Sequence, residues 1–130
     1  MLDTNSVSHL LRGHPAVDRA IAARLRSELC VSAVTTGELL VGLHKLPENH
    51  RLAAATEQFL AQVETLPWDI AAARSYGALR VELESRRRPL APLDLLISAH
   101  SLAVGVVLVT NDQAMLRLPD LLTEDWTRDL

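Results

Sequence analysis

The chain has 130 residues, with 13 Lys and Arg against 16 Asp and Glu, so its formal net charge is −3 at pH 7. That length is typical of one domain, and 48% apolar with 22% charged residues excludes an intrinsically disordered chain. The four aromatic side chains are too few for a base-stacking platform, and the mild acidity argues against a protein that coats nucleic acid by bulk charge.

The elements predicted along the chain alternate between strands and helices. In chain order, the sequence predicts a strand ending at residue 2, helices over 6–12 and 16–25, a strand over 29–34, helices over 36–46 and 51–63, an edge strand over 65–68, helices over 70–87 and 92–104, a strand over 106–109 and a last edge strand over 121–126. Pro92 suits a first helical turn, and Gly105 suits a helix end. We therefore expect one α/β domain over residues 1–130, with a mostly parallel sheet covered by helices.

Compartment signals are few. The single cysteine, Cys30, excludes an intrachain disulfide. The start, Met1-Leu2-Asp3, has no basic region followed by an apolar region, so we expect no signal peptide. The longest uncharged run, residues 95–111, is slightly short for a membrane span and contains His100. We expect a cytoplasmic protein with no membrane partner.

Four acidic residues stand where predicted strands end or helices start: Asp3, Glu38, Asp94 and Asp112. Ligands of open α/β sheets bind outside the carboxyl ends of the strands, so these positions are candidates for one site. Each also has a structural interpretation. Asp3 suits a helix cap, Thr35 and Glu38 fit a capping box, Asp94 favours a helix dipole, and Asp112 follows Asn111 in a turn.

The surroundings of these acids favour a metal site. Asp94 lies among leucines, Asp112 closes an apolar strand, and the chain's lone lysine, Lys45, is not near any of the four in sequence. Carboxylates gathered without cations raise one another's pKa or bind a divalent metal. Hard oxygen ligands select Mg²⁺ or Mn²⁺, and the absence of clustered His and Cys argues against zinc.

Four segments together resemble the motifs of PIN-domain ribonucleases, and the chain's size and their order resemble the VapC toxins of bacterial toxin–antitoxin pairs. The segments are Leu2-Asp3-Thr4-Asn5, Thr36-Gly37-Glu38-Leu39, Pro92-Leu93-Asp94-Leu95-Leu96-Ile97-Ser98-Ala99-His100 and Val109-Thr110-Asn111-Asp112. The resemblance covers essentially the whole chain. It implies a PIN-like three-layer sandwich with a sheet ordered 3-2-1-4-5.

The same resemblance implies roles for the acids and their neighbours. Asp3, Glu38, Asp94 and Asp112 are expected to meet at the carboxyl edge as catalytic residues and metal ligands. Asn5 and Thr110 match the polar partners that orient acids and water. We expect hydrolysis of RNA phosphodiesters with one or two Mg²⁺ ions, for which Mn²⁺ can substitute.

Substrate contacts are expected from arginines. Arg86, Arg87 and Arg88 follow the predicted helix over 70–87 and precede the Asp94 segment. They fit either a solvated helix end that suits the dipole or contacts to RNA phosphates, and both interpretations stay open. His100 is predicted to be a core or interface histidine, and Asp69 is predicted to be a helix cap.

The sequence also leads to expectations about the substrate, the partner proteins and the alternative functions. The resemblance implies a structured RNA substrate such as tRNA, a VapB-like antitoxin and a homodimer or larger toxin–antitoxin assembly. A non-toxin PIN nuclease and a catalytically silent PIN scaffold that binds RNA or protein are the alternatives. A haloacid-dehalogenase-like phosphatase is disfavoured because Asn5 stands where its second aspartate is needed. A receiver domain is disfavoured because no lysine follows Lys45.

Overall fold

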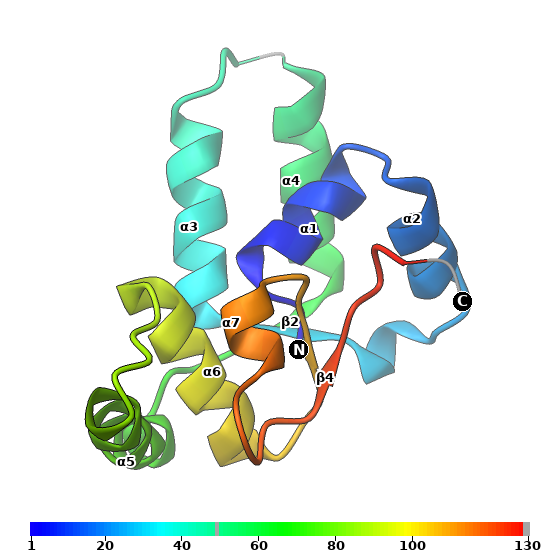
Figure 1. Ribbon diagram of the computed structural model, residues 1–130. Helices are drawn as coiled ribbons and strands as arrows, with labels where there is room; N and C mark the ends of the chain where they lie inside the picture. The colour runs from blue at the N-terminus through cyan, green and yellow to red at the C-terminus, as the bar shows by residue number, and fades with distance from the viewer. Residues whose placement is uncertain (49, 129–130) are drawn as a thin grey trace.

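The computed structural model describes residues 1–48 and 50–128, in which short parallel strands are surrounded by helices (Figure 1). The expected domain range of 1–130 therefore includes residue 49 and residues 129–130, which lie outside the described residues. The helices are α1 (Thr4–Leu11), α2 (Pro15–Ala22), α3 (Ala33–His44), α4 (Arg51–Gln62), α5 (Ile70–Ser85), α6 (Pro92–Val104) and α7 (Gln113–Leu116), with a 3₁₀ turn at Arg26–Glu28. The strands are β1 (Cys30–Ser32), β2 (Glu64–Leu66), β3 (Leu108–Val109) and β4 (Thr123–Glu124).

The strands pair around the first two residues of the chain. β1 pairs in parallel with β2, and β3 pairs in parallel with β4. Between β1 and β3 lies Leu2, whose N–H donates to Cys30 O at 3.0 Å and which forms a parallel bridge with Val109. Counting Met1-Leu2 as the first strand, the spatial order is 3-2-1-4-5, so the expected order is confirmed. This order puts residue 3 in the middle of the sheet edge.

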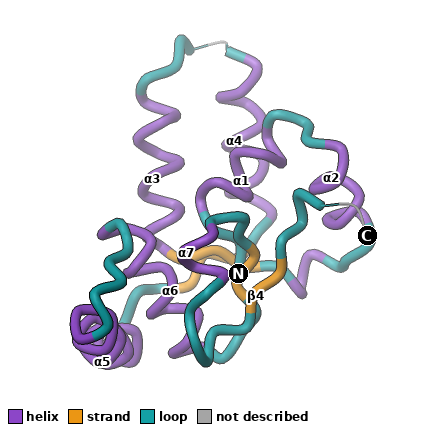
Figure 2. The backbone as a smooth tube through the Cα atoms, in the orientation of Figure 1, coloured by secondary structure: helices purple, strands orange, loops and turns teal. Residues whose placement is uncertain are grey.

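The central strands separate two apolar cores. Met1 and Leu108 pack with residues of α5, α6 and α7, whereas Leu2 and Val109 pack with residues of α1, α2 and α4. Successive side chains of a strand point to opposite faces of the sheet. Met1 and Leu2 therefore lie in different cores, and so do Leu108 and Val109. Figure 2 shows the strands near the middle of the molecule, with helices around them. α3 and α4 run beside each other and extend away from the sheet (Figure 1).

The strands are shorter than expected because residues at their ends form hydrogen bonds with the adjoining helices instead of with a neighbouring strand. The predicted strand over 29–34 stops at Ser32, since the hydroxyl of Ser32 accepts from Val34 N and caps α3. The predicted start of this helix at residue 36, and the capping box of Thr35 with Glu38, were therefore wrong. The predicted strand over 106–109 is reduced to two residues, because Val106 N–H bonds to Ser101 O at the end of α6.

Most helix boundaries follow their capping residues. α6 covers the predicted range, with Pro92 in its first turn and Gly105 at φ 76° after its last. Asp69 caps α5 as expected, its Oδ1 accepting from Ala72 N at 3.1 Å. The sequence did not predict α7, which is a single turn. Across the described parts of the chain, none of the helices has the length and apolar character needed to cross a membrane.

Candidate functional site

Asp3 stands directly after the central strand segment and is almost fully buried, with 2% of its surface exposed. Its N–H donates to Val109 O at 3.0 Å, which ties its backbone to β3. Its Oδ1 accepts from Ser6 N at 2.8 Å, so Asp3 is the N-cap of α1. Ser6 Oγ also donates to Val109 O. The position of this carboxylate is therefore set by both the sheet and the helix.

Glu38 reaches the same edge from the middle of α3. Its Oε1 accepts a hydrogen bond of 2.7 Å from Thr4 Oγ1, the residue next to Asp3. Thr35, one turn earlier on α3 and fully buried, lies with its hydroxyl 3.4 Å from that of Thr4. Because α3 starts three residues earlier than expected, Glu38 is released from capping its own helix and binds α1 instead. The sequence reasoning missed Thr4 and Thr35.

Asp112 follows β3 and is the N-cap of α7. Its Oδ1 accepts from the backbone N–H groups of Ala114 at 2.9 Å and Met115 at 3.1 Å. Its own N–H donates to Thr110 Oγ1 at 3.1 Å. Thr110 is fully buried, and its hydroxyl donates to Met115 Sδ. Thr110 therefore holds Asp112 at the end of β3.

Asp94 lies in the first turn of α6, and its pKa is affected by the other three acids. Burial raises the pKa of Asp94 above its ordinary value, and the negative charges of Asp112, Asp3 and Glu38 raise it further, in that order of size. The strand order puts Asp3 and Asp112 at the ends of neighbouring strands, and Glu38 is hydrogen-bonded to Thr4 beside Asp3, so the charges that act on Asp94 lie at one edge of the sheet. Their mutual repulsion is the electrostatic property that a bound cation relieves.

The chemistry of these donors fits a divalent metal. All four are hard carboxylate oxygens, which suit Mg²⁺ and Mn²⁺. Within residues 1–48 and 50–128, no three His, Cys, Asp or Glu side chains form a ready set of metal ligands. Oδ2 of Asp3 and Oδ2 of Asp112 form no hydrogen bond to described residues, since only Oδ1 of each is used in capping. The site thus combines fixed carboxylate positions with oxygens left for a ligand.

The remaining expected site residues are Asn5 and the three arginines that follow α5, and all four are exposed. Asn5 is exposed in the first turn of α1, next to Thr4. Arg86, Arg87 and Arg88 are exposed where α5 ends and the chain turns toward α6. Arg86 pairs with Glu82 one turn earlier, with 3.0 Å between Nη2 and Oε1. The structure therefore does not place these arginines among the four acids.

Comparison with known proteins agrees with this arrangement. Residues 1–121 match the PIN domain family. A relative from Shigella flexneri, the tRNA(fMet)-specific endonuclease VapC, is 35% identical over 128 residues, which are 98% of this chain and 97% of the relative. The crystal structure of DNA-bound VapBC from Salmonella typhimurium matches with a TM-score of 0.88 and 33% identity, covering 97% of this chain and 96% of that chain.

A second solved structure gives the same result. The crystal structure of VapBC2 from Rickettsia felis, bound to a DNA fragment from their promoter, matches with a TM-score of 0.86 and 28% identity over 97% of both chains. The fold and the acidic edge thus define a nuclease-like α/β domain. The chain belongs to the PIN-domain family, in its group of VapC ribonucleases. That family is one of nucleases that generally depend on divalent metal ions.

Proposed function

We propose that this protein is a Mg²⁺-dependent endoribonuclease and the toxin of a toxin–antitoxin pair. The observation that supports this most is the position of Asp3 and Asp112 at the ends of neighbouring strands, with Glu38 hydrogen-bonded to Thr4 beside Asp3. The negative charges of Asp112, Asp3 and Glu38, which add to the effect of burial in raising the pKa of Asp94, agree with this. Four carboxylates at one sheet edge bind a divalent cation in preference to staying close together unneutralised. The family membership supplies the reaction class, hydrolysis of an RNA phosphodiester.

The four acids are proposed to have two roles, binding the metal and orienting the attacking water. Asp3, Asp94 and Asp112, with Glu38, would hold the metal, which when bound supplies Lewis-acid stabilisation and makes water easier to deprotonate. Glu38 is fixed by Thr4 Oγ1 and keeps its second carboxylate oxygen for orienting the attacking water. One P–O bond forms to the water oxygen, and the bond from phosphorus to the ribose oxygen breaks. The attacking water gives up one proton and the leaving oxygen takes up one, so a water molecule is added in total and the products are two shorter RNA chains.

The proposed substrate is tRNA. The Shigella flexneri relative carries tRNA(fMet) specificity in its name and covers nearly the whole chain. The scarcity of aromatic side chains supports recognition by RNA shape and backbone instead of by base stacking. Initiator tRNA is therefore the first substrate to test, and such a substrate places the activity in the cytoplasm.

The proposed partners are an antitoxin and a second copy of the chain. The matching structures from Salmonella typhimurium and Rickettsia felis are VapBC complexes, each solved with DNA. By this similarity we propose that a VapB-like antitoxin binds the protein and keeps it inactive, and that the toxin forms homodimers within the complex.

The activity test compares site variants with a matched control. We expect purified protein to cut a tRNA(fMet) transcript with Mg²⁺ or Mn²⁺ and to stop with EDTA. Asp3→Asn and Asp94→Asn are expected to lose activity at least 100-fold, on the order of the loss of an essential metal ligand. Asp18→Asn, the same change at an exposed residue of α2, is expected to keep full activity. Full activity in Asp3→Asn or Asp94→Asn would refute the assignment.

The toxin role needs its own experiment. We expect induced expression to stop growth, and co-expression with the product of the adjacent antitoxin gene to restore it. Cleavage of RNA without toxicity would favour a non-toxin nuclease. Metal binding without cleavage would favour a silent scaffold. Sequencing of RNA ends after brief induction would identify the cleaved RNA.

A further inference from the structure

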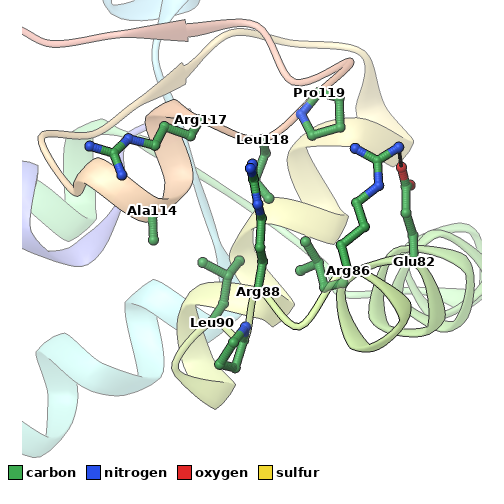
Figure 3. Close-up of a pocket in the computed structure, with 10 residues that line it drawn as sticks. Glu82, Arg86, Arg88, Leu90, Ala114, Arg117, Leu118 and Pro119 are labelled. Carbon is green, nitrogen blue, oxygen red and sulfur yellow. Dashed lines mark ion pairs between the residues drawn. The ribbon is translucent and has the colours of Figure 1, made fainter.

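A cavity of about 300 Å³ lies between the end of α5, the turn that leads to α6, and α7 (Figure 3). Its floor is apolar and includes Leu83, Leu90 and Leu118. Its rim carries three arginines, Arg86, Arg88 and Arg117, together with Glu82. A cavity with an apolar floor and a cationic rim suits a ligand that has an anionic group beside an apolar surface.

The three arginines are not equally available to a ligand. Arg86 is engaged by Glu82, as the dashed line in Figure 3 shows. Arg88 and Arg117 form no ion pair with any residue in 1–48 or 50–128, and both are exposed. In Figure 3, Arg88 stands between Ala114 of α7 and Arg86 at the end of α5, and the side chain of Arg117, the C-cap of α7, extends away from Arg88. Two arginines without an ion pair to any described residue therefore line one cavity.

The position of Arg88 is set by the backbone. Arg88 N–H bonds to Leu83 O at 3.0 Å, and Arg87 N–H bonds to Glu84 O at 3.2 Å, which together form a Schellman ending of α5. Arg87 adopts the left-handed conformation with φ 52° that this ending requires. Two hydrogen bonds therefore fix the direction in which the chain leaves the helix and bring Arg88 to the cavity.

α7 connects this cavity with the acidic edge. Asp112 caps the first turn of α7, Ala114 lines the cavity, and Arg117 is the residue that ends the helix. From Asp112 to Arg117 the chain advances five residues, which is about 7.5 Å at 1.5 Å each. One short helix thus has an acid of the candidate site at one end and an unpaired arginine at the other. This spacing lets a single polyanionic strand pass from one to the other.

We propose that Arg88 and Arg117 each bind a backbone phosphate of the RNA near the scissile one, with the apolar floor of the cavity covered by the adjoining nucleoside. The proposal rests on the proposed ribonuclease function. Four carboxylates repel RNA wherever they are not neutralised, so a strand that reaches them needs cations beside them. Guanidinium groups bind phosphate in a bidentate manner and stay charged. An RNA strand uses both the acids and the arginines, whereas an acidic peptide uses the arginines alone.

The test measures RNA binding and its salt dependence. Fluorescein-labelled tRNA(fMet) is titrated with Asp94→Asn protein, which leaves the RNA uncut, alone and combined with Arg88→Ala, Arg117→Ala or both. We expect each arginine change to weaken binding about five- to tenfold and to reduce the slope of log K against log salt by about 0.7–0.9, the value for one lost phosphate contact. Arg26→Ala, at an exposed arginine of the 3₁₀ turn, removes the same charge elsewhere and is expected to change binding less than twofold.

Kinetics separate this role from the catalytic one. In protein with Asp94 intact, Arg88→Ala and Arg117→Ala should raise KM for tRNA(fMet) while kcat changes less than threefold. Binding and salt slopes equal to those of Arg26→Ala would overturn the proposal. So would unchanged RNA binding combined with loss of the antitoxin in pull-down, which would assign the cavity to the protein partner. Failure of the unsubstituted protein to cut RNA would instead refute the proposed function itself.

Discussion

The hydroxyl oxygen of Ser32 lies 2.8 Å from Nδ1 of His100, and both side chains are fully or almost fully buried. The same oxygen accepts from Val34 N at 3.1 Å and caps α3. The two groups form a buried hydrogen bond, in which the donor is Nδ1 or the Ser32 hydroxyl according to the tautomer of the ring. This network joins the start of α3, which carries Glu38, to α6, which carries Asp94. It confirms the expectation of a core histidine.

Removing the hydroxyl of Ser32 tests this network. We expect Ser32→Ala to lower the free energy of unfolding by about 1–3 kcal/mol, because the cap of α3 is lost and a buried imidazole nitrogen loses its hydrogen-bond partner. Urea denaturation followed by circular dichroism measures the change. Ser27→Ala, at an exposed residue of the 3₁₀ turn, is the control and should change stability by less than about 0.5 kcal/mol. Equal stability of the two variants would contradict the role of Ser32.

The buried imidazole also makes stability depend on pH. Burial lowers the pKa of His100 below 6.5, and the charge of Asp69 and the bond to Pro67 offset this only in part. The unfolded chain therefore binds a proton at a higher pH than the folded chain does. As pH falls below about 6.5, the unfolded state gains protons first, so the free energy of unfolding decreases toward the lower folded pKa.

Unfolding measured in urea at pH 7.5 and pH 5.5 checks this prediction. We expect the unsubstituted protein to lose more stability, or gain less, between pH 7.5 and pH 5.5 than His100→Gln does, even where the variant is less stable overall. His44→Gln changes an exposed histidine and should keep the dependence of the unsubstituted protein. An identical pH dependence in His100→Gln would assign the effect to other groups.

The backbone at Arg87 predicts a stabilising substitution. Its φ of 52° lies in the left-handed region, which costs an L-residue about 1 kcal/mol relative to glycine. We expect Arg87→Gly to increase the free energy of unfolding by about 0.5–1 kcal/mol. Arg74→Gly, at an exposed position inside α5, should decrease it by about 1 kcal/mol. A destabilised Arg87→Gly would show that the arginine side chain contributes more than its backbone strain costs.

The sequence predicted those parts of the site that depend on local signals. Asp3 was predicted as both a cap and a site residue, and its capping is confirmed. Asp112 was expected in a turn and proves to cap α7. Such predictions succeed because a carboxylate at a strand end satisfies nearby N–H groups in the same segment. The strand order came from resemblance to a family, since periodicity alone does not say which strands are neighbours.

The predictions that proved wrong or were not made concern the start of α3 and the presence of α7. Both depend on contacts between segments that are distant in the sequence. Thr35 and Glu38 match a capping box locally, yet buried Ser32 begins the helix three residues earlier and Glu38 bonds to Thr4, 34 residues away. α7 is too short to show any periodicity, so Arg117 gave no sign of lying near the site. Neither contact is visible until the sheet brings the segments together.

The negative charges around Asp94 predict that this residue lowers the free energy of unfolding in the absence of metal and contributes to metal binding. Burial and three neighbouring carboxylates raise the pKa of Asp94 in the folded protein, so the folded state holds this proton more tightly than the unfolded state does. As pH rises above the ordinary value of 3.8, the unfolded state loses the proton first, and the folded state becomes less stable relative to it. At pH 7, without metal, ionised Asp94 is therefore expected to destabilise the fold.

Asp94→Asn removes that charge and most of the affinity for metal. In EDTA at pH 7, we expect the variant to melt a few degrees above the unsubstituted protein. Adding Mg²⁺ should raise the melting temperature of the unsubstituted protein, because a ligand that binds only the folded state stabilises it by mass action, and should leave the variant nearly unchanged. Asp18→Asn, on α2, should behave like the unsubstituted protein in both conditions. If Asp94→Asn melted lower in EDTA, or if Mg²⁺ stabilised it equally, Asp94 would not be the charge that the cation neutralises.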